Sequence, residues 1–393
     1  MNFELLEKAN GLFEFSRDLR RDLHKHPELG FREVRTANIV AQELKQLGLE
    51  VTTGVAETGV IGLLHGSRSG PTVLLRFDMD ALPIQEETGL EFASEVQGVM
   101  HACGHDGHVA VGLTVARILS SERQNFKGTF KFMFQPAEEG LGGAAGMIAA
   151  GVLENPRVDA ALALHLWNER PVGWTAVVPG PFMAGADIFS IQIKGKGGHG
   201  AIPDQATDPV IAAAEMISSI QSIVSRNISP LDAAVVSVTQ VTAGNAFNII
   251  PPEANIRGTI RSFEKEVRDL VLTRLENLVK GIAVGFGCEA QLEIQQLTPA
   301  VVNDPKITIL VEQAIKTSLP DTQLDHSYHT MVSEDMAFVL QKVPGCYVFT
   351  GSGGPDPALN YGHHHPKFTI DERVLPRAAA GISAAALGII ERL

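Results

Sequence analysis

The chain has 393 residues, more than one hydrophobic core usually holds, so two domains are the first expectation. A hydrophobic content of 45% and a charged content of 20% are ordinary for a globular protein and argue against a disordered one. The formal net charge of −13 argues against a nucleic-acid partner, because binding to phosphates depends on clustered lysine and arginine.

The three cysteines, Cys103, Cys288 and Cys346, are too few and too scattered for a disulfide framework. The first thirty residues carry charges throughout and lack the apolar core of a secretory signal. No run approaches the roughly 20 apolar residues that span a bilayer. We therefore expect a cytoplasmic protein without a membrane partner.

The first half of the chain alternates apolar strands with amphipathic helices, a pattern typical of an α/β sheet. Residues 72–78, 129–135 and 160–165 are short apolar runs, as strands buried on both faces should be. A helical pattern starts after Gly107, and residues 346–351 predict a later strand of the same sheet. The expected fold class is α/β, with a mixed, mostly parallel sheet.

The segment 184–298 has a different pattern, in which strands alternate apolar and polar residues as half-buried strands do. A helix with Asp208 as its N-cap follows the first strand, and a second helix is expected around 264–286. The order β-α-β-β-α-β is the split ferredoxin-like arrangement, which can form a small α+β domain. We therefore expect one α/β domain, residues 1–183 and 299–393, interrupted by this insertion.

Polar side chains follow three of the predicted strands where each strand ends. Asp78 and Asp80 follow the first, Glu138 and Glu139 follow the second, and His165 ends the third. Open α/β sheets bind ligands beyond the carboxyl ends of their strands, so these groups should share one crevice. Taken alone, the glutamate pair could be a solvated acidic loop and His165 a hydrogen-bonded core residue.

The stretch MHACGHDGH, residues 100–108, is dense in metal-binding groups. Cys103 and His105 are two residues apart and can reach one metal from a tight loop, and no partner with zinc-finger or haem spacing follows. His101, Asp106 and His108 are expected behind the ligands, because metal-bound imidazoles usually donate their second N–H to another group. The alternative is a loop of hydrogen-bonded histidines around a buried thiol.

Three further features are ambiguous on local sequence. Glycines flank His199, but Pro203 interrupts the helix that a dinucleotide site would need, so an exposed loop presenting one imidazole is expected. Arg261 lies on the polar face of a predicted strand and could hold a substrate carboxylate or form a surface ion pair. The loop at 363–366 could return a histidine to the crevice.

Several motifs together resemble the hippurate hydrolase group of metallo-amidohydrolases, which includes N-acyl-amino-acid amidohydrolases and plant auxin-conjugate hydrolases. The resemblance covers almost the whole chain in the expected order. It is carried by HPELGF, FDMDALPIQEETG, MHACGHDGH, FQPAEEG, LALHLW, GGHGAIP, NAFNIIP, SEDMAFVLQKVPG and HHPKF.

This resemblance implies a catalytic α/β domain that holds two divalent metals, and an inserted domain that covers the site and forms a homodimer or tetramer. The implied metal ligands are Cys103, His105, Glu139, His165 and His364. His364 is preferred because the family motif is His-x-Pro, and His363 would replace it only if the loop were shifted. Glu138 maps to the general base, His199 to an imidazole that reaches the substrate, and Asn248 or Arg261 to a grip on the substrate carboxylate.

The chain departs from the wider superfamily at two places. Many members carry His-x-Asp after the first site strand, where this chain has Asp78-Met79-Asp80, and Cys103 stands where relatives use a bridging aspartate. The roles of Asp78 and Asp80 stay open, with Asp80 expected behind the ligands. A thiolate and imidazoles suit zinc, while the carboxylate and the family pattern also suit manganese, cobalt or nickel.

The implied activity is hydrolysis of the amide bond of small N-acyl-L-amino acids, such as hippurate or N-acetyl amino acids. A metal-activated water would attack the amide while Glu138 takes its proton. The alternatives are a metallo-carboxypeptidase or dipeptidase on the same fold, a catalytically silent binding protein, and a single structural zinc.

Overall fold

The computed structural model describes residues 2–393, which divide into two compact units. The first unit runs up to Gly180 and resumes at Val302–Tyr328 and Asp335–Leu393. The second unit comprises Pro181–Val301 and the short piece His329–Glu334. The expected insertion bounds of 184 and 298 lie just inside Pro181–Val301, whereas residues 329–334 had been expected in the α/β domain.

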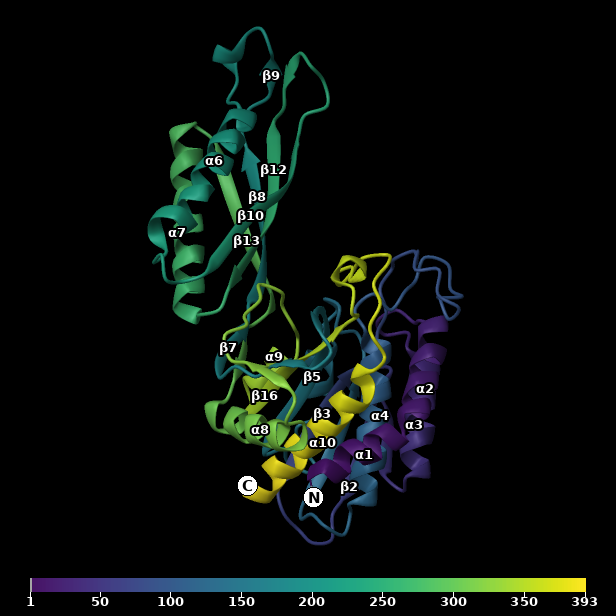
Figure 1. Cartoon of the computed structure of the whole chain (residues 1–393). Helices are drawn as coiled ribbons and strands as arrows, with labels where there is room; N and C mark the ends of the chain where they lie inside the picture. The colour runs from purple at the N-terminus through teal and green to yellow at the C-terminus, as the bar shows by residue number, and fades with distance from the viewer. Residues whose placement is uncertain (1) are drawn as a thin grey trace. The chain divides into compact units, whose positions relative to one another are not determined.

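The first unit is built on an eight-stranded sheet in the order β1-β2-β4-β3-β5-β16-β6-β15 (Figure 1). Its strands are β1 Glu50–Val55, β2 Gly59–His65, β3 Thr72–Asp78, β4 Thr129–Gln135, β5 Ala160–Pro171, β6 Trp174–Ala176, β15 Gln323–Asp325 and β16 Gly345–Gly353. The central strands β4, β3, β5 and β16 run parallel, while β2 and β6 are antiparallel to their neighbours β4 and β16. The predicted α/β class with a mixed, mostly parallel sheet is confirmed.

Helices bury the central strands of this sheet. They are α1 Asn2–Gly11, α2 Phe13–Lys25, α3 Val34–Gln46, α4 His105–Ser121, α5 Gly143–Ala149, α8 Pro305–Ser318, α9 Ala337–Leu340 and α10 Val374–Arg392. Helices α4 and α10 pack side by side against β3 and β5, and α1 and α2 pack onto them (Figure 1). Every residue of β3 and β4 is buried, as their apolar runs predicted.

Helix α4 begins before Gly107 rather than after it. The residue ahead of the helix, Gly104, has a φ of +88°, a left-handed conformation that glycine adopts at little cost. This turn lets the helix start at His105, so the imidazole sits in the first helical turn.

Helix α10 meets the length and composition limits for a membrane span, although the sequence shows no long unbroken apolar run. The apolar stretch of α10 that meets these limits is 78% buried inside the protein, which is typical of a core helix.

The second unit contains a four-stranded antiparallel sheet in the order β10-β12-β8-β13. Its elements in chain order are β8 Gly185–Lys194, α6 Pro209–Asn227, β10 Ala234–Ala243, β12 Glu253–Ser262, α7 Lys265–Gly285 and β13 Glu289–Thr298. This is the predicted β-α-β-β-α-β order, and the carboxylate of Asp208 caps α6 by accepting the N–H of Val210. Short strands β9 Gly198–His199 and β11 Ile249–Ile250 form a separate pair, and β7 Gly180–Met183 and β14 Val301–Asn303 lie where the chain enters and leaves this unit.

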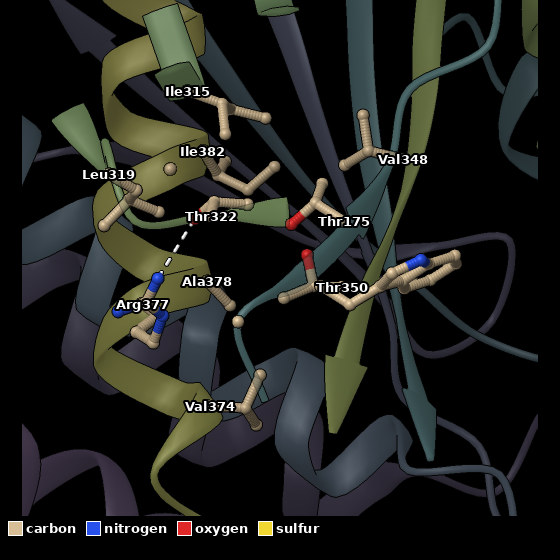
Figure 2. Close-up of a pocket in the computed structure, with 13 residues that line it drawn as sticks. Thr175, Ile315, Leu319, Thr322, Val348, Thr350, Val374, Arg377, Ala378 and Ile382 are labelled. Carbon is tan, nitrogen blue, oxygen red and sulfur yellow. Dashed lines mark hydrogen bonds between the residues drawn. The ribbon is translucent and has the colours of Figure 1, made fainter. Parts of the chain in front are cut away.

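A small cavity of about 10 Å³ lies in the first unit among α8, α10, β6 and β16 (Figure 2). Apolar side chains such as Ile315, Leu319 and Ile382 line it, and Arg377 donates to the hydroxyl of Thr322 at its edge. This volume is close to that of one water molecule and far below that of a substrate pocket. The cavity shares no residue with the predicted ligand set.

Candidate metal centre

The five predicted ligands converge beyond the carboxyl ends of the central strands. The ligand atoms of Cys103, His105 and His165 lie within 4.8 Å of one another, and so do those of Cys103, Glu139 and His364. Cys103 belongs to both groups. The expected crevice therefore gathers sulfur, nitrogen and oxygen donors from segments that are far apart in sequence.

The five donors come from four segments of the chain, since Cys103 and His105 lie together around the start of α4. Cys103 precedes α4, His165 lies within β5, and Glu139 lies in the loop after β4. His364 comes from the loop before α10, where its φ of +65° is strained for a residue with a side chain. Its backbone N–H donates to the carbonyl of Ala102 over 2.8 Å, which ties this loop to the segment that carries Cys103.

Hydrogen bonds orient the rings of two of the predicted ligand histidines. Nδ1 of His105 donates to the carbonyl oxygen of Asp80 over 2.9 Å, and Nδ1 of His165 donates to the carbonyl oxygen of Leu166 over 3.0 Å. With Nδ1 engaged in this way, Nε2 is the nitrogen that each neutral ring can offer to a metal. This is the arrangement in which a partner behind the ligand orients a metal-binding imidazole. Burial lowers the pKa of His105, but the nearby Asp78 carboxylate and Cys103 raise it well above its usual value, so a cation at Nε2 would displace a proton there.

The electrostatics of the site favour a bound cation. Burial, together with the nearby carboxylate of Glu139, raises the pKa of the Cys103 thiol well above its usual value. A cation reverses this effect, because a coordinating thiol is deprotonated. Burial, with His108 and His363 nearby, holds the pKa of His165 well below its usual value, so its imidazole is neutral as a ligand must be.

The donor geometry also suits a metal ion. Among residues 2–393, the buried Nε2 of His105 has no hydrogen-bond partner. Sγ of Cys103 lies 3.4 Å from Nε2 of His165, and Nε2 of His364 lies 3.2 Å from Oε1 of Glu139. Ligand atoms on a tetrahedral zinc with bonds of 2.0–2.3 Å lie roughly 3.3–3.8 Å apart. The residues present therefore fit divalent cations.

Glu138 lies beside this donor set. One of its carboxylate oxygens lies within 4.8 Å of ligand atoms of His105 and Glu139. Its Oε1 accepts the backbone N–H of Asp335 over 3.3 Å. The loop that carries it is tightly wound, since a Cβ on Gly143 would lie 1.7 Å from the carbonyl oxygen of Pro136. Glu138 is thus held close to two of the predicted ligands, His105 and Glu139.

Asp80 contacts two of the predicted ligands, His105 and Glu139. Besides its contact with His105, its Oδ2 accepts the backbone N–H of Glu139 over 3.0 Å. Asp80 therefore orients one donor from α4 and one from the loop after β4.

Asp78 also approaches the predicted ligands, since its Oδ2 lies 3.7 Å from Nε2 of His105, whereas His108 and Asp106 are engaged by other partners. Nδ1 of His108 donates to Asp78, and Nε2 of His108 accepts the N–H of Leu166, so neither ring nitrogen is available to a metal. Asp106 accepts from Nε of Arg20 over 2.7 Å, within a cluster of fully buried charges. His101 is buried, and burial lowers its pKa to about 4.

The remaining predicted residues belong to the second unit. His199 is exposed on β9, its strand partner is Ile249, and Gly200 donates its N–H to the carbonyl of Asn248. His199 and Asn248 are therefore neighbours. Arg261 lies near the C-terminal end of β12, where it pairs with Ala186. The start of β12 at Glu253 follows soon after Asn248 in the chain, and at roughly 3.3 Å per residue Arg261 is about 25 Å along the strand from Glu253.

Sequence reasoning missed three buried polar residues near the centre, which are Arg76, Gln135 and Asp335. Arg76 interrupts the apolar strand TVLLRFD, and a charge inside a strand buried on both faces needs a buried partner. The sequence therefore indicated that Arg76 needs a buried partner, and the SEDMAF motif pointed to the segment that contains Asp335. The hydrogen bond between Arg76 and Asp335 joins residues 259 positions apart, so the local sequence could not predict it.

A model of peptidase family M20/M25/M40 matches residues 74–387. The chain belongs to this family. It is 42% identical over 377 residues to an N-acetylcysteine deacetylase of Bacillus subtilis, with 96% of this chain and 97% of the relative covered. It is 38% identical over 373 residues to the hippurate hydrolase of Campylobacter jejuni, with 94% and 95% covered.

A solved structure shares the fold over its full length. The Bacillus subtilis YXEP protein, described as a dinuclear metal binding peptidase from the M20 family, aligns with a TM-score of 0.86 at 37% identity. The alignment covers 98% of this chain and 100% of that chain. The resemblance inferred from the motifs is confirmed, and the protein is a metallo-amidohydrolase.

Proposed function

We propose that this metallo-amidohydrolase cleaves the amide bond of N-acyl-L-amino acids. The observation that carries the proposal is the convergence of two donor groups around Cys103, with Glu138 beside them. The deacetylase and hippurate hydrolase relatives support the substrate class, since their names describe amides of this type.

The proposed metal ligands, which would hold two divalent cations, are Cys103, His105, Glu139, His165 and His364, and Cys103 belongs to both donor groups. When bound, such cations lower the pKa of a shared water and polarise the amide carbonyl. The mixed thiolate, imidazole and carboxylate set suits zinc, and manganese, cobalt or nickel are the alternatives to test.

Glu138 acts as the general base in this proposal. Its carboxylate takes the proton of the attacking water and returns it to the departing amine, so that a neutral leaving group forms. Its hydrogen bond from the N–H of Asp335 helps to hold the carboxylate in place. Asp80 keeps His105 and Glu139 oriented throughout.

We assign the substrate contacts to the second unit. His199 donates a hydrogen bond to the oxygen on which negative charge develops. Asn248, the neighbour of His199, or Arg261 at the far end of β12 grips the amino-acid carboxylate. We also propose that this unit covers the site and forms the homodimer or tetramer, and that the enzyme is cytoplasmic. Strand β10 supports the dimer, because it is an edge strand whose second half is exposed.

The proposal is tested by stripping the protein with a chelator and adding back zinc, manganese, cobalt or nickel one at a time. Hydrolysis of hippurate, N-acetyl amino acids, auxin-like conjugates and dipeptides is then followed. Glu138→Ala should lower kcat roughly 100-fold or more, whereas Glu7→Ala, a change of an exposed glutamate on α1, should not. Cleavage of dipeptides alone would identify a carboxypeptidase or dipeptidase, and no cleavage at all would identify a binding protein.

A further inference from the structure

A continuous path of hydrogen bonds begins at the general base and runs into the core of the sheet. Oε1 of Glu138 accepts the backbone N–H of Asp335 over 3.3 Å. The carboxylate of Asp335 in turn accepts Nη2 of Arg76 over 3.0 Å and the side-chain amide of Gln135 over 2.8 Å. Asp335 also accepts the N–H of Ala144, where α5 begins beyond the loop of Glu138.

The same path continues from Arg76 to a metal ligand. Nη1 of Arg76 donates to Oδ2 of Asp78 over 2.6 Å, and Oδ1 of Asp78 accepts Nδ1 of His108. Nε2 of His108 accepts the N–H of Leu166 over 2.9 Å. The carbonyl of Leu166 accepts Nδ1 of His165, so the path ends on the ring whose Nε2 faces Cys103.

Arg76 is the only cation on this path that carries a permanent charge, and it lies at its centre. Its side chain is 0% exposed in the middle of β3, and Asp78 and Asp335 are 0% and 2% exposed at their side chains. A guanidinium presents several donors in a fixed plane, so one side chain can bind two carboxylates and the amide of Gln135 at once. A lysine ammonium of similar charge lacks this planar fork.

We infer that Arg76 is a positioning residue that fixes the general base Glu138 and the metal ligand His165 relative to each other. On one side Arg76 holds the carboxylate of Asp335, and the backbone N–H of Asp335 in turn holds the carboxylate of Glu138. On the other side it holds Asp78 and, through His108, the strand that carries His165. The inference rests on the proposed function for the role of Glu138, whereas the part that concerns His165 rests on metal binding alone.

The path has two arms that start at Arg76. The arm to the base runs through Asp335 to Glu138, and the arm to His165 runs through Asp78 and His108. Substitutions in the two arms should have different effects. Asp335→Asn weakens only the arm to the base, so kcat should fall roughly tenfold while metal affinity and KM stay within about threefold. Asp78→Asn weakens the arm to His165 and also the contact of Asp78 with Nε2 of His105 at 3.7 Å, so metal affinity should fall by roughly 10–100-fold, the range typical of changes behind a metal ligand, while the arm to the base is untouched. Arg76→Lys should show both effects.

The decisive measurements are a competition titration of metal into the stripped protein, and kcat and KM at saturating metal. Arg76→Lys is also combined with Glu138→Asp. If Arg76 acts through Glu138, its effect on kcat should be at least about threefold smaller in the Glu138→Asp background, because residues that act as a unit are not additive. A fully additive pair would overturn the arm to the base.

Lys131→Met is the matched control. Lys131 is another buried cation, on the adjacent strand β4, and it donates to the carbonyls of Val152, Glu154 and Pro156 rather than toward the metal centre. This variant should lose thermal stability but keep kcat and metal affinity. If folded Arg76→Lys behaves in the same way, Arg76 is a structural residue and the inference is wrong.

The outcomes also separate this inference from the proposed function. A wild-type protein that hydrolyses no amide would refute the proposed function, while the metal titrations of Asp78→Asn and Asp335→Asn would still test the arm to His165. Unchanged metal affinity in Asp78→Asn would refute that arm, whatever the activity.

Discussion

Oε1 of Glu33 accepts the backbone N–H of Ala137 over 2.9 Å, and Ala137 is the residue directly before Glu138. Ala137 has a φ of +54°, a left-handed conformation that is uncommon for a residue other than glycine. The second oxygen of Glu33 accepts the hydroxyl of Thr58, and the glutamate side chain is fully buried. A carboxylate from the start of α3 therefore holds the strained backbone from which Glu138, the proposed general base, projects.

Glu33→Leu should therefore damage catalysis as well as stability. The change leaves the buried N–H of Ala137 without an acceptor, which costs about 1–3 kcal/mol of unfolding free energy. The freed loop should lower kcat about tenfold or more with a smaller change in KM. Denaturant unfolding and steady-state kinetics measure both effects. Glu33→Gln keeps one acceptor oxygen and should recover most of the activity; equal kcat values in wild type and Glu33→Leu would contradict the positioning role.

Replacing Cys103 should remove metal binding, because its sulfur belongs to both donor groups. A serine hydroxyl is a far weaker ligand than a thiolate, so Cys103→Ser should lower the metal content below two ions per chain and kcat by roughly 100-fold or more. Metal analysis after dialysis measures the content.

Cys346→Ser is the control for this change, since Cys346 is also a buried free cysteine, within β16. This variant should lose some stability and keep the metal content of the wild type. Full metal content in Cys103→Ser would show that the thiol is not a ligand.

The local sequence was enough to predict the strands whose burial follows a simple pattern. Strands β3 and β4 are buried on both faces and read as apolar runs, and β12 alternates because one face is buried. The start of α4 was missed because a left-handed glycine at position 104, rather than a capping side chain, sets it.

The candidate site was readable where neighbouring residues carry the chemistry, as in Cys103 and His105. It was not readable where one interaction joins distant segments. The pairing of Arg76 with Asp335 and that of Glu33 with Ala137 depend on how β3, α3 and the loops pack, and no local pattern encodes that packing. The motif resemblance indicated that these segments matter, but it gave no contact for Arg76, Glu33 or Asp335.

His363 and His364 should respond differently to substitution, although they are neighbours. Burial lowers the pKa of His363 to about 4, its Nε2 donates to the carbonyl of Leu166, and its ring stacks on Trp167 at 4.5 Å. His363→Phe keeps the stacking and should change metal affinity by less than the roughly 10–100-fold typical of changes behind a ligand. His364→Ala removes a proposed ligand and should exceed that range. A metal titration in which His363→Phe is the weaker binder would reverse the assignment.

Lys131 should make the free energy of unfolding rise as the pH is raised above about 8. Burial lowers its pKa to about 8, from 10.5 for the free side chain. Between pH 8 and 10.5 the unfolded chain therefore binds more protons at this site than the folded chain, and stability rises with pH wherever that holds.

Lys131→Met lacks this contribution, and it also leaves three backbone carbonyls without their donor. The variant should thus be less stable than wild type at pH 7, and the gap should widen as the pH is raised to about 10. Urea unfolding of both proteins, stripped of metal, at several pH values measures the gap. A gap that narrows with rising pH would mean that the three carbonyls raise the pKa of Lys131 more than burial lowers it.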